Sequence, residues 1–150
     1  MMVGALLVSR FMSVVATTVL IVSRLSLSDL VNACRRHGIA VRWVRLPHDL
    51  RGLYRHTART IYLAHDMSET LALPTLLHEM EHARRGDDGH QSRAVERRID
   101  ETVSHRLITA EEYARAEALT GGRGSGAIAA EMGLPKWVVS AYRRTLRRVR

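Results

Sequence analysis

The chain has 150 residues, 46% of them hydrophobic, one cysteine, and a formal net charge of +8. This length and composition predict one compact domain with a real core, with room for a small appendage. The single Cys34 excludes a disulfide within the chain and a thiolate zinc cluster, and it fits a reducing cytoplasm. The positive charge either attracts acidic partners, including nucleic acid, or only solvates an arginine-rich surface.

Residues 1–24 form an apolar extension unlike the rest of the chain. An unbroken run of apolar and small hydroxyl residues from Phe11 to Val22 lies between Arg10 and Arg24. The run is too short to span a bilayer comfortably, and it lacks a clear signal-peptide cleavage site. It is a marginal membrane anchor, an extra helix, or the product of an overlong gene start. We expect a dispensable extension on a cytoplasmic protein, with membrane anchoring as the alternative.

The next segment, within a predicted domain of residues 25–120, combines one helix with short strands. Ser26 is expected to cap a helix that Gly38 ends. Strands are predicted at residues 39–46, 53–55 and 60–63, with a hairpin turn at Thr57-Ala58. The expected class is α+β, with a small antiparallel sheet beside the helix that follows.

That helix carries the motif His78-Glu79-Met80-Glu81-His82, in which histidines four residues apart share one face. Two imidazoles at this spacing are a ready pair of zinc ligands, and Glu79 is placed to take a proton from an attacking water. The alternative is two histidines on a solvated helix. Ser68 is expected to cap this helix, Pro74 to bend or divide it, and Gly86 to end it.

A helix over residues 92–108 holds a second informative pattern. A buried row at i+4 spacing runs beside a row formed by Glu96 and Asp100; its members are Val95, Ile99, Val103 and Leu107. Carboxylates beside a core row are costly without a compensating cation. We therefore predict Glu96 as the third zinc ligand and Asp100 as the group that orients a ligand histidine. The alternative is a solvated shoulder paired with arginine.

Other positions for the third ligand are less well supported. The long metzincin motif requires histidine at position 88 and glycine at position 85, where this chain has Asp88 and Arg85. His90, in a polar connector, remains an alternative ligand. A glutamate from the following helix, with an acidic residue four positions on, is the gluzincin arrangement.

Together the strand at 59–63, the motif at 77–83 and the segment Val95 to Asp100 resemble the ImmA/IrrE-type zinc metallopeptidases. The resemblance covers roughly residues 27–120. It implies a zincin-like fold, zinc held by His78, His82 and Glu96, Glu79 as general base, and cleavage of a regulatory protein such as a helix-turn-helix repressor. The chain departs from the family in having Glu81 where glycine is frequent, and Arg98-Ile99 where Glu-Ala is frequent.

The C-terminal part is predicted to be helical and basic. Thr109 and Glu112 form a capping box for one helix, and residues 121–126 read as a glycine-rich linker. In residues 127–150, Ala129, Gly133 and Val139 match helix-turn-helix spacing. The basic residues that would meet phosphates are Lys136, Arg143, Arg144 and Arg147. The alternative is a structural or substrate-docking helical hairpin, since few polar groups are offered to base edges.

Two function classes follow from these patterns. The first is a zinc metalloendopeptidase with a protein substrate, which we expect to add as an extended strand to the edge of the strand at residues 60–63. The second is a non-catalytic, zinc-stabilised protein that binds DNA or a repressor. For the oxyanion partner of the peptidase, His65, His105, Tyr62 and Tyr113 remain equal candidates.

Overall fold

The computed structural model describes residues 25–47, 49–89 and 91–148, and it confirms the α+β class. The elements in chain order are α2 (Leu27–Arg36), β1 (Ala40–Val44), β2 (Gly52–Arg55), β3 (Thr60–Ala64), α3 (Glu69–Arg85), α4 (Arg93–Leu107), α5 (Ala110–Leu119), α6 (Ser125–Met132) and α7 (Lys136–Arg148). The predictions for residues 1–24 and for His90 lie outside the described residues. None of the helices in the described ranges combines the length and apolar character that crossing a membrane requires.

The sheet is mixed, so the prediction of an antiparallel sheet is wrong for β1. Its order is β1-β3-β2, with β1 parallel to β3 and β2 antiparallel to it. The chain between β1 and β2 carries β2 to the outer edge, and the turn at residues 56–59 brings β3 back between the two. The central β3 therefore has no free edge, and the predicted substrate edge at residues 60–63 is also wrong.

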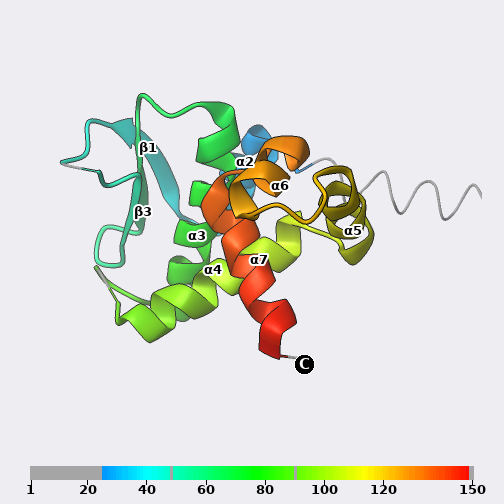
Figure 1. Cartoon of the computed structure of the whole chain (residues 1–150). Helices are drawn as coiled ribbons and strands as arrows, with labels where there is room; N and C mark the ends of the chain where they lie inside the picture. The colour runs from blue at the N-terminus through cyan, green and yellow to red at the C-terminus, as the bar shows by residue number, and fades with distance from the viewer. Residues whose placement is uncertain (1–24, 48, 90, 149–150) are drawn as a thin grey trace, which may run out of the picture.

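Helix α3 lies at the centre of the first core. Leu76 and Leu77 of α3 are buried against Ile61 and Leu63 of β3 on one side and against α4 on the other. In Figure 1 the sheet lies to the left and α5 to the right, with α3, α4 and α7 between them. This placement sets the face of α3 that carries the two motif histidines between the sheet and α4.

The boundaries of α3 differ in part from those predicted. Ser68 is the N-cap residue, but its side chain makes no capping hydrogen bond, whereas Gly86 ends the helix in the left-handed conformation, with φ of 74°. The helix is not divided at Pro74, which lies buried within it. Pro74 is the sixth residue of α3, so it lacks the N–H that would bond to the Thr70 carbonyl, and the helix continues across this missing hydrogen bond.

Helices α5, α6 and α7 enclose a second core around Ile128, Val138 and Val139. Helix α7 also packs along α4, and Trp137 at its start contacts both cores. Ser125 and Gly126, predicted as linker, form the first turn of α6. The C-terminal residues therefore extend the same packed body that contains the motif helix.

The capping box of α5 is present as predicted and gives the first testable expectation. The Thr109 hydroxyl accepts the N–H of Glu112 at 3.2 Å, and the Glu112 carboxylate accepts the N–H of Thr109 at 3.1 Å. Thr109→Ala is expected to lower the free energy of unfolding by about 1 kcal/mol, measured by urea denaturation. Thr102→Ala is the matched control, because that exposed threonine only bonds back to the Arg98 carbonyl. Equal losses in the two variants would contradict a capping role.

Candidate metal centre

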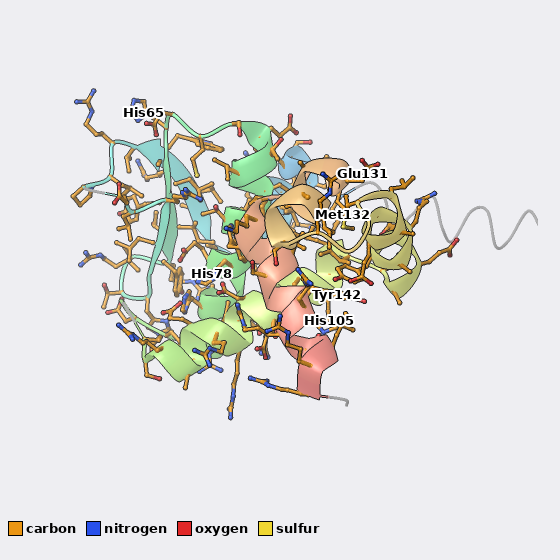
Figure 2. All side chains as sticks on the ribbon, in the orientation of Figure 1. His65, His78, His105, Glu131, Met132 and Tyr142 are labelled. Carbon is orange, nitrogen blue, oxygen red and sulfur yellow. The ribbon has the colours of Figure 1, made fainter. Side chains whose placement is uncertain are left out.

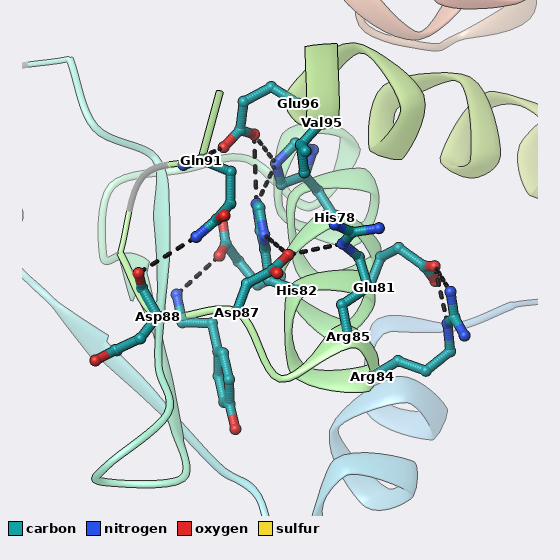
Figure 3. Close-up of polar contacts among 12 residues, drawn as sticks. His78, Glu81, His82, Arg84, Arg85, Asp87, Asp88, Gln91, Val95 and Glu96 are labelled. Atoms are coloured by element: carbon teal, nitrogen blue, oxygen red, sulfur yellow. Dashed lines mark hydrogen bonds and ion pairs between the residues drawn. The ribbon is translucent and has the colours of Figure 1, made fainter. Parts of the chain in front are cut away.

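Helices α3 and α4 bring His78, His82 and Glu96 to one point. Each residue offers one ligand atom, and these atoms lie within 4.8 Å of one another. The Nε2 atoms of the two histidines are 3.1 Å apart, and Glu96 Oε2 lies 3.1 Å from His78 Nε2 and 3.3 Å from His82 Nε2. Figure 3 shows Glu96 reaching across from α4 to both rings. The arrangement could hold a metal ion.

A second layer of carboxylates fixes the orientation of both rings. Asp100 Oδ1 lies 3.1 Å from His78 Nδ1, and Asp87 Oδ2 lies 3.0 Å from His82 Nδ1. An ionised carboxylate only accepts hydrogen bonds, so each ring donates from Nδ1, and in its neutral form presents the lone pair of Nε2 inward. Three lone-pair atoms turned to one point repel one another unless a cation lies between them. The donor set therefore fits a divalent metal.

Asp100 occupies the place that the sequence predicts, whereas Asp87 was missed. Gly86 ends α3 in the left-handed conformation, and the Asp87 N–H then bonds to the His82 carbonyl at 3.0 Å. This turn folds the Asp87 side chain back beside the ring of His82. The available signal was an acidic residue directly after a helix-ending glycine, at a distance from which it reaches the last turn of the helix.

The remaining oxygen of Glu96 is also held in place. Its Oε1 accepts the backbone N–H of Gln91 at 3.0 Å. Because Oε1 is engaged by the connector before α4, Oε2 is the oxygen left to face the histidines. Gln91 was not singled out in the sequence, since a backbone donor leaves no signal in residue type.

Glu79 lies beside the cluster and is only 6% exposed. Its Oε2 accepts the Tyr54 backbone N–H at 2.8 Å, which ties the carboxylate to β2. A Cβ at Gly52 would come within 2.7 Å of Glu79 Oε1 and 2.8 Å of the Thr75 methyl, so only glycine lets β2 approach this closely. Strand β2 therefore packs directly against α3, the motif helix.

Burial and neighbouring charges shift the pKa values of Glu79 and His78. Burial raises the pKa of Glu79, although His78, His82 and the Tyr54 N–H oppose the rise. Burial lowers the pKa of His78, but the hydrogen bond to Asp100 and the charges of Glu79, Asp100 and Glu96 outweigh this effect and raise it. An excess of carboxylates around two imidazoles thus favours positive charge at this point, which is the condition for binding a cation.

A small pocket of about 140 Å³ opens onto the cluster. It is lined by the motif residues and by β2 and its approach, namely Leu50, Gly52, Leu53, Tyr54, His78, Glu79, His82, Gly89 and Glu96. None of the four oxyanion candidates lines it. His65 is exposed just after β3, and His105 packs against Tyr142 near the end of α4, away from His78 (Figure 2).

Glu81, one of the residues at which the chain departs from the family that it resembles, faces away from the cluster. It is buried and accepts hydrogen bonds from Arg84, with Nε at 2.8 Å, and from Arg106 of α4 at 3.2 Å. The hydrogen bond from Arg84 lowers the pKa of Glu81. The glutamate therefore links α3 to α4 and does not crowd the pocket beside the cluster.

The predicted nucleic-acid-binding residues divide into two kinds. Arg144 points to α4, with its guanidinium 3.8 Å from Asp100 and 3.5 Å from Glu101, and Arg143 contacts Ser125 at 3.4 Å. Lys136 and Arg147 are exposed. Two of the four thus serve contacts within the chain.

Comparison of the chain with models of known protein families, with curated proteins and with solved structures finds no match.

The pair Asp87 and Asp88 offers a direct test of the layer around the histidines. Asp87→Asn is expected to weaken metal binding by about tenfold, because an amide holds the His82 ring less firmly and supports its Nε2 lone pair less. Asp88→Asn is the matched control, since the Asp88 carboxylate accepts the His56 backbone N–H, at 3.0 Å, instead of a hydrogen bond from a motif histidine. Competition with a chromogenic chelator measures both affinities. Equal affinities would contradict the role assigned to Asp87.

Proposed function

We propose that the chain is a zinc-dependent endopeptidase. The observation that carries the proposal is the position of Glu79, whose carboxylate is held against β2 beside a three-ligand cluster and faces the same pocket. Structural zinc sites usually have four protein ligands, whereas catalytic sites have three and keep one position open. A histidine pair, a glutamate and an adjacent buried carboxylate form the donor set of a zinc hydrolase.

The residues of the chain divide the work of peptide hydrolysis. When bound, zinc supplies a Lewis acid that polarises the scissile carbonyl and makes water a nucleophile at neutral pH. Glu79 takes the proton of the attacking water on Oε1, the oxygen that the Tyr54 N–H does not occupy, and passes it to the leaving amine. Because burial raises the pKa of Glu79, the protonated carboxyl group that Glu79 carries between these two proton transfers is accessible. Asp87 and Asp100 hold the ligand rings in one orientation throughout.

The outer edge of β2 is the proposed place for an extended substrate. The Arg51 carbonyl bonds inward to Ala64, and the Tyr54 N–H turns outward to Glu79. Since successive residues of a strand alternate in direction, the backbone groups of Gly52 and Tyr54 face the pocket. A peptide added to this edge lies along the metal cluster. The outer edge of β2 thus replaces the edge of β3 as the proposed binding strand.

The proposed substrate is a regulatory protein such as a helix-turn-helix repressor, and the proposed setting is the cytoplasm. The substrate follows from the resemblance to the ImmA/IrrE-type metallopeptidases, and the setting follows from the single cysteine, which fits a reducing compartment. In support, the two histidines and Glu79 lie on one helix and Glu96 lies on the next, as that resemblance implies.

The second candidate is a non-catalytic, zinc-stabilised protein that binds DNA or a repressor. The observations that favour it are the α6–α7 helix pair and the exposed Lys136 and Arg147 on α7.

Charge reversal of Lys136 and Arg147 tests this candidate. It is a cleaner test than truncation, because removing the tail would expose the core face of α4. An unchanged electrophoretic shift of DNA in the double variant would contradict DNA binding through α7.

Glu79→Gln separates the two candidates. We expect bound zinc to stay the same, because Glu79 is not a ligand, and cleavage of a co-expressed repressor from a neighbouring gene to fall by about 100-fold or more. Metal analysis and gel quantification of the cleaved repressor measure the two effects. Glu69→Gln, at the exposed start of α3, is the control and should cleave normally. Regulation that is unchanged in the Glu79→Gln variant would favour the non-catalytic candidate.

A further inference from the structure

The first turn of α7 forms one wall of the metal centre. The rings of Trp137 and His78 meet edge to face, with centroids 6.2 Å apart and planes at 88°. Trp137 is partly buried and packs against both cores, so its position is fixed from two sides. A residue from the C-terminal tail therefore borders the same space as the motif histidines.

Two recesses meet at Trp137 and lead away from the metal cluster. The inner one, of about 250 Å³, contains Gly52, His78 and Glu79 among its lining residues and so joins the pocket described above. The outer one, of about 550 Å³, is lined by Arg51, Leu71, Asp100, Pro135, Lys136, Trp137, Ser140 and Arg144. Both recesses are lined by Arg51, Asp100 and Trp137, so the two recesses form one continuous groove.

The charge of this groove changes sign along its length. The inner recess is bordered by three carboxylates, those of Asp49, Glu79 and Asp100, with Arg51 at its junction with the outer recess. The outer recess has three basic side chains, those of Arg51, Lys136 and Arg144, and only one carboxylate, that of Asp100. Asp100 is already engaged by His78 and Arg144. In the described ranges, neither Arg51 nor Lys136 forms an ion pair with a carboxylate. The outer recess thus presents two uncompensated positive charges above an apolar floor.

We propose that this outer recess is a substrate subsite that binds an acidic side chain of the protein substrate. The apolar walls, Leu71, Pro135 and Trp137, pack against the methylene groups of a glutamate, while Arg51 and Lys136 meet its carboxylate. A peptide lying on the edge of β2 passes Arg51, which precedes that strand, and so reaches the recess without leaving the groove. The assignment of the occupant as a substrate rests on the proposed peptidase function.

Binding of dansylated peptides to a variant that cannot turn over tests the subsite. The full chain, zinc-loaded, carries Glu79→Gln and Trp43→Phe, which leaves Trp137 as its only tryptophan. The probes are a dansylated hexapeptide with two glutamates and its glutamine counterpart. We expect dansyl anisotropy to show about fivefold tighter binding of the glutamate peptide, with energy transfer from Trp137.

Charge variants locate the binding. Lys136→Glu is expected to weaken binding of the glutamate peptide by about tenfold and Lys136→Arg to preserve it. Arg97→Glu on the exposed face of α4 is the matched control and should have no effect beyond that of net charge. Equal binding of the two peptides, or equal losses in the Lys136→Glu and Arg97→Glu variants, would overturn the proposal. So would tighter binding of a DNA duplex that the same Lys136→Glu change abolishes, because the recess would then be a phosphate site.

The outcome separates the subsite from the proposed function. If the glutamate peptide binds as expected but the unmodified protein cleaves no repressor, the peptidase proposal fails and the acidic-peptide site stands. If the protein cleaves a repressor while neither binding nor cleavage responds to Lys136→Glu, the subsite fails and the peptidase stands.

Discussion

The structure depends on the convergence of side chains from α3 and α4 on one point. His78 and His82 reach this point because they are one helical turn apart, and Glu96 reaches it because α4 packs against α3. Four carboxylates, those of Glu79, Asp87, Glu96 and Asp100, then surround two imidazoles. Such a concentration of negative charge beside an apolar core is costly unless a cation offsets it. The surrounding contacts make sense as parts of a metal centre, in which every ligand is held by a second partner.

The elements around this point are shaped to support it. Strand β2 is short, yet its Tyr54 N–H holds Glu79 and its Gly52 allows the close approach. Glu81, which could have crowded the site, instead joins α3 to α4 through Arg84 and Arg106. At the other side, α7 contributes Trp137 beside His78 and Arg144 beside Asp100. The C-terminal helices therefore form part of the site's surroundings.

The predictable part of the site is the part governed by helical periodicity. The i and i+4 spacing placed both histidines on one face, and the same spacing in α4 placed Glu96 and Asp100 beside the buried row of Ile99 and Val103. Capping by Ser26 and Thr109 depends on a side chain and the next few residues, and the sequence predicted both caps. These features are local, so the identity and spacing of residues determine them.

The missed features depend on contacts between distant segments. Alternation within a strand does not reveal which neighbour it pairs with, so the parallel pairing of β1 and β3 and the edge position of β2 were not predictable. Asp87 acts through a left-handed turn, while Gln91 and Tyr54 act through backbone N–H groups that carry no residue signature. The approach of Trp137 to His78 follows from the packing of α7 on α4, which separate helix patterns do not specify.

X-ray absorption spectroscopy of the zinc-loaded protein examines the metal centre itself. We expect one zinc per chain with two imidazole nitrogens at about 2.0–2.1 Å, a carboxylate oxygen at about 2.0–2.2 Å, and one further light atom from solvent. Loss of one imidazole contribution in His82→Ala would tie the spectrum to α3. A spectrum without imidazole ligands, or a protein that takes up no zinc at micromolar concentrations, would contradict the existence of the centre and with it the peptidase.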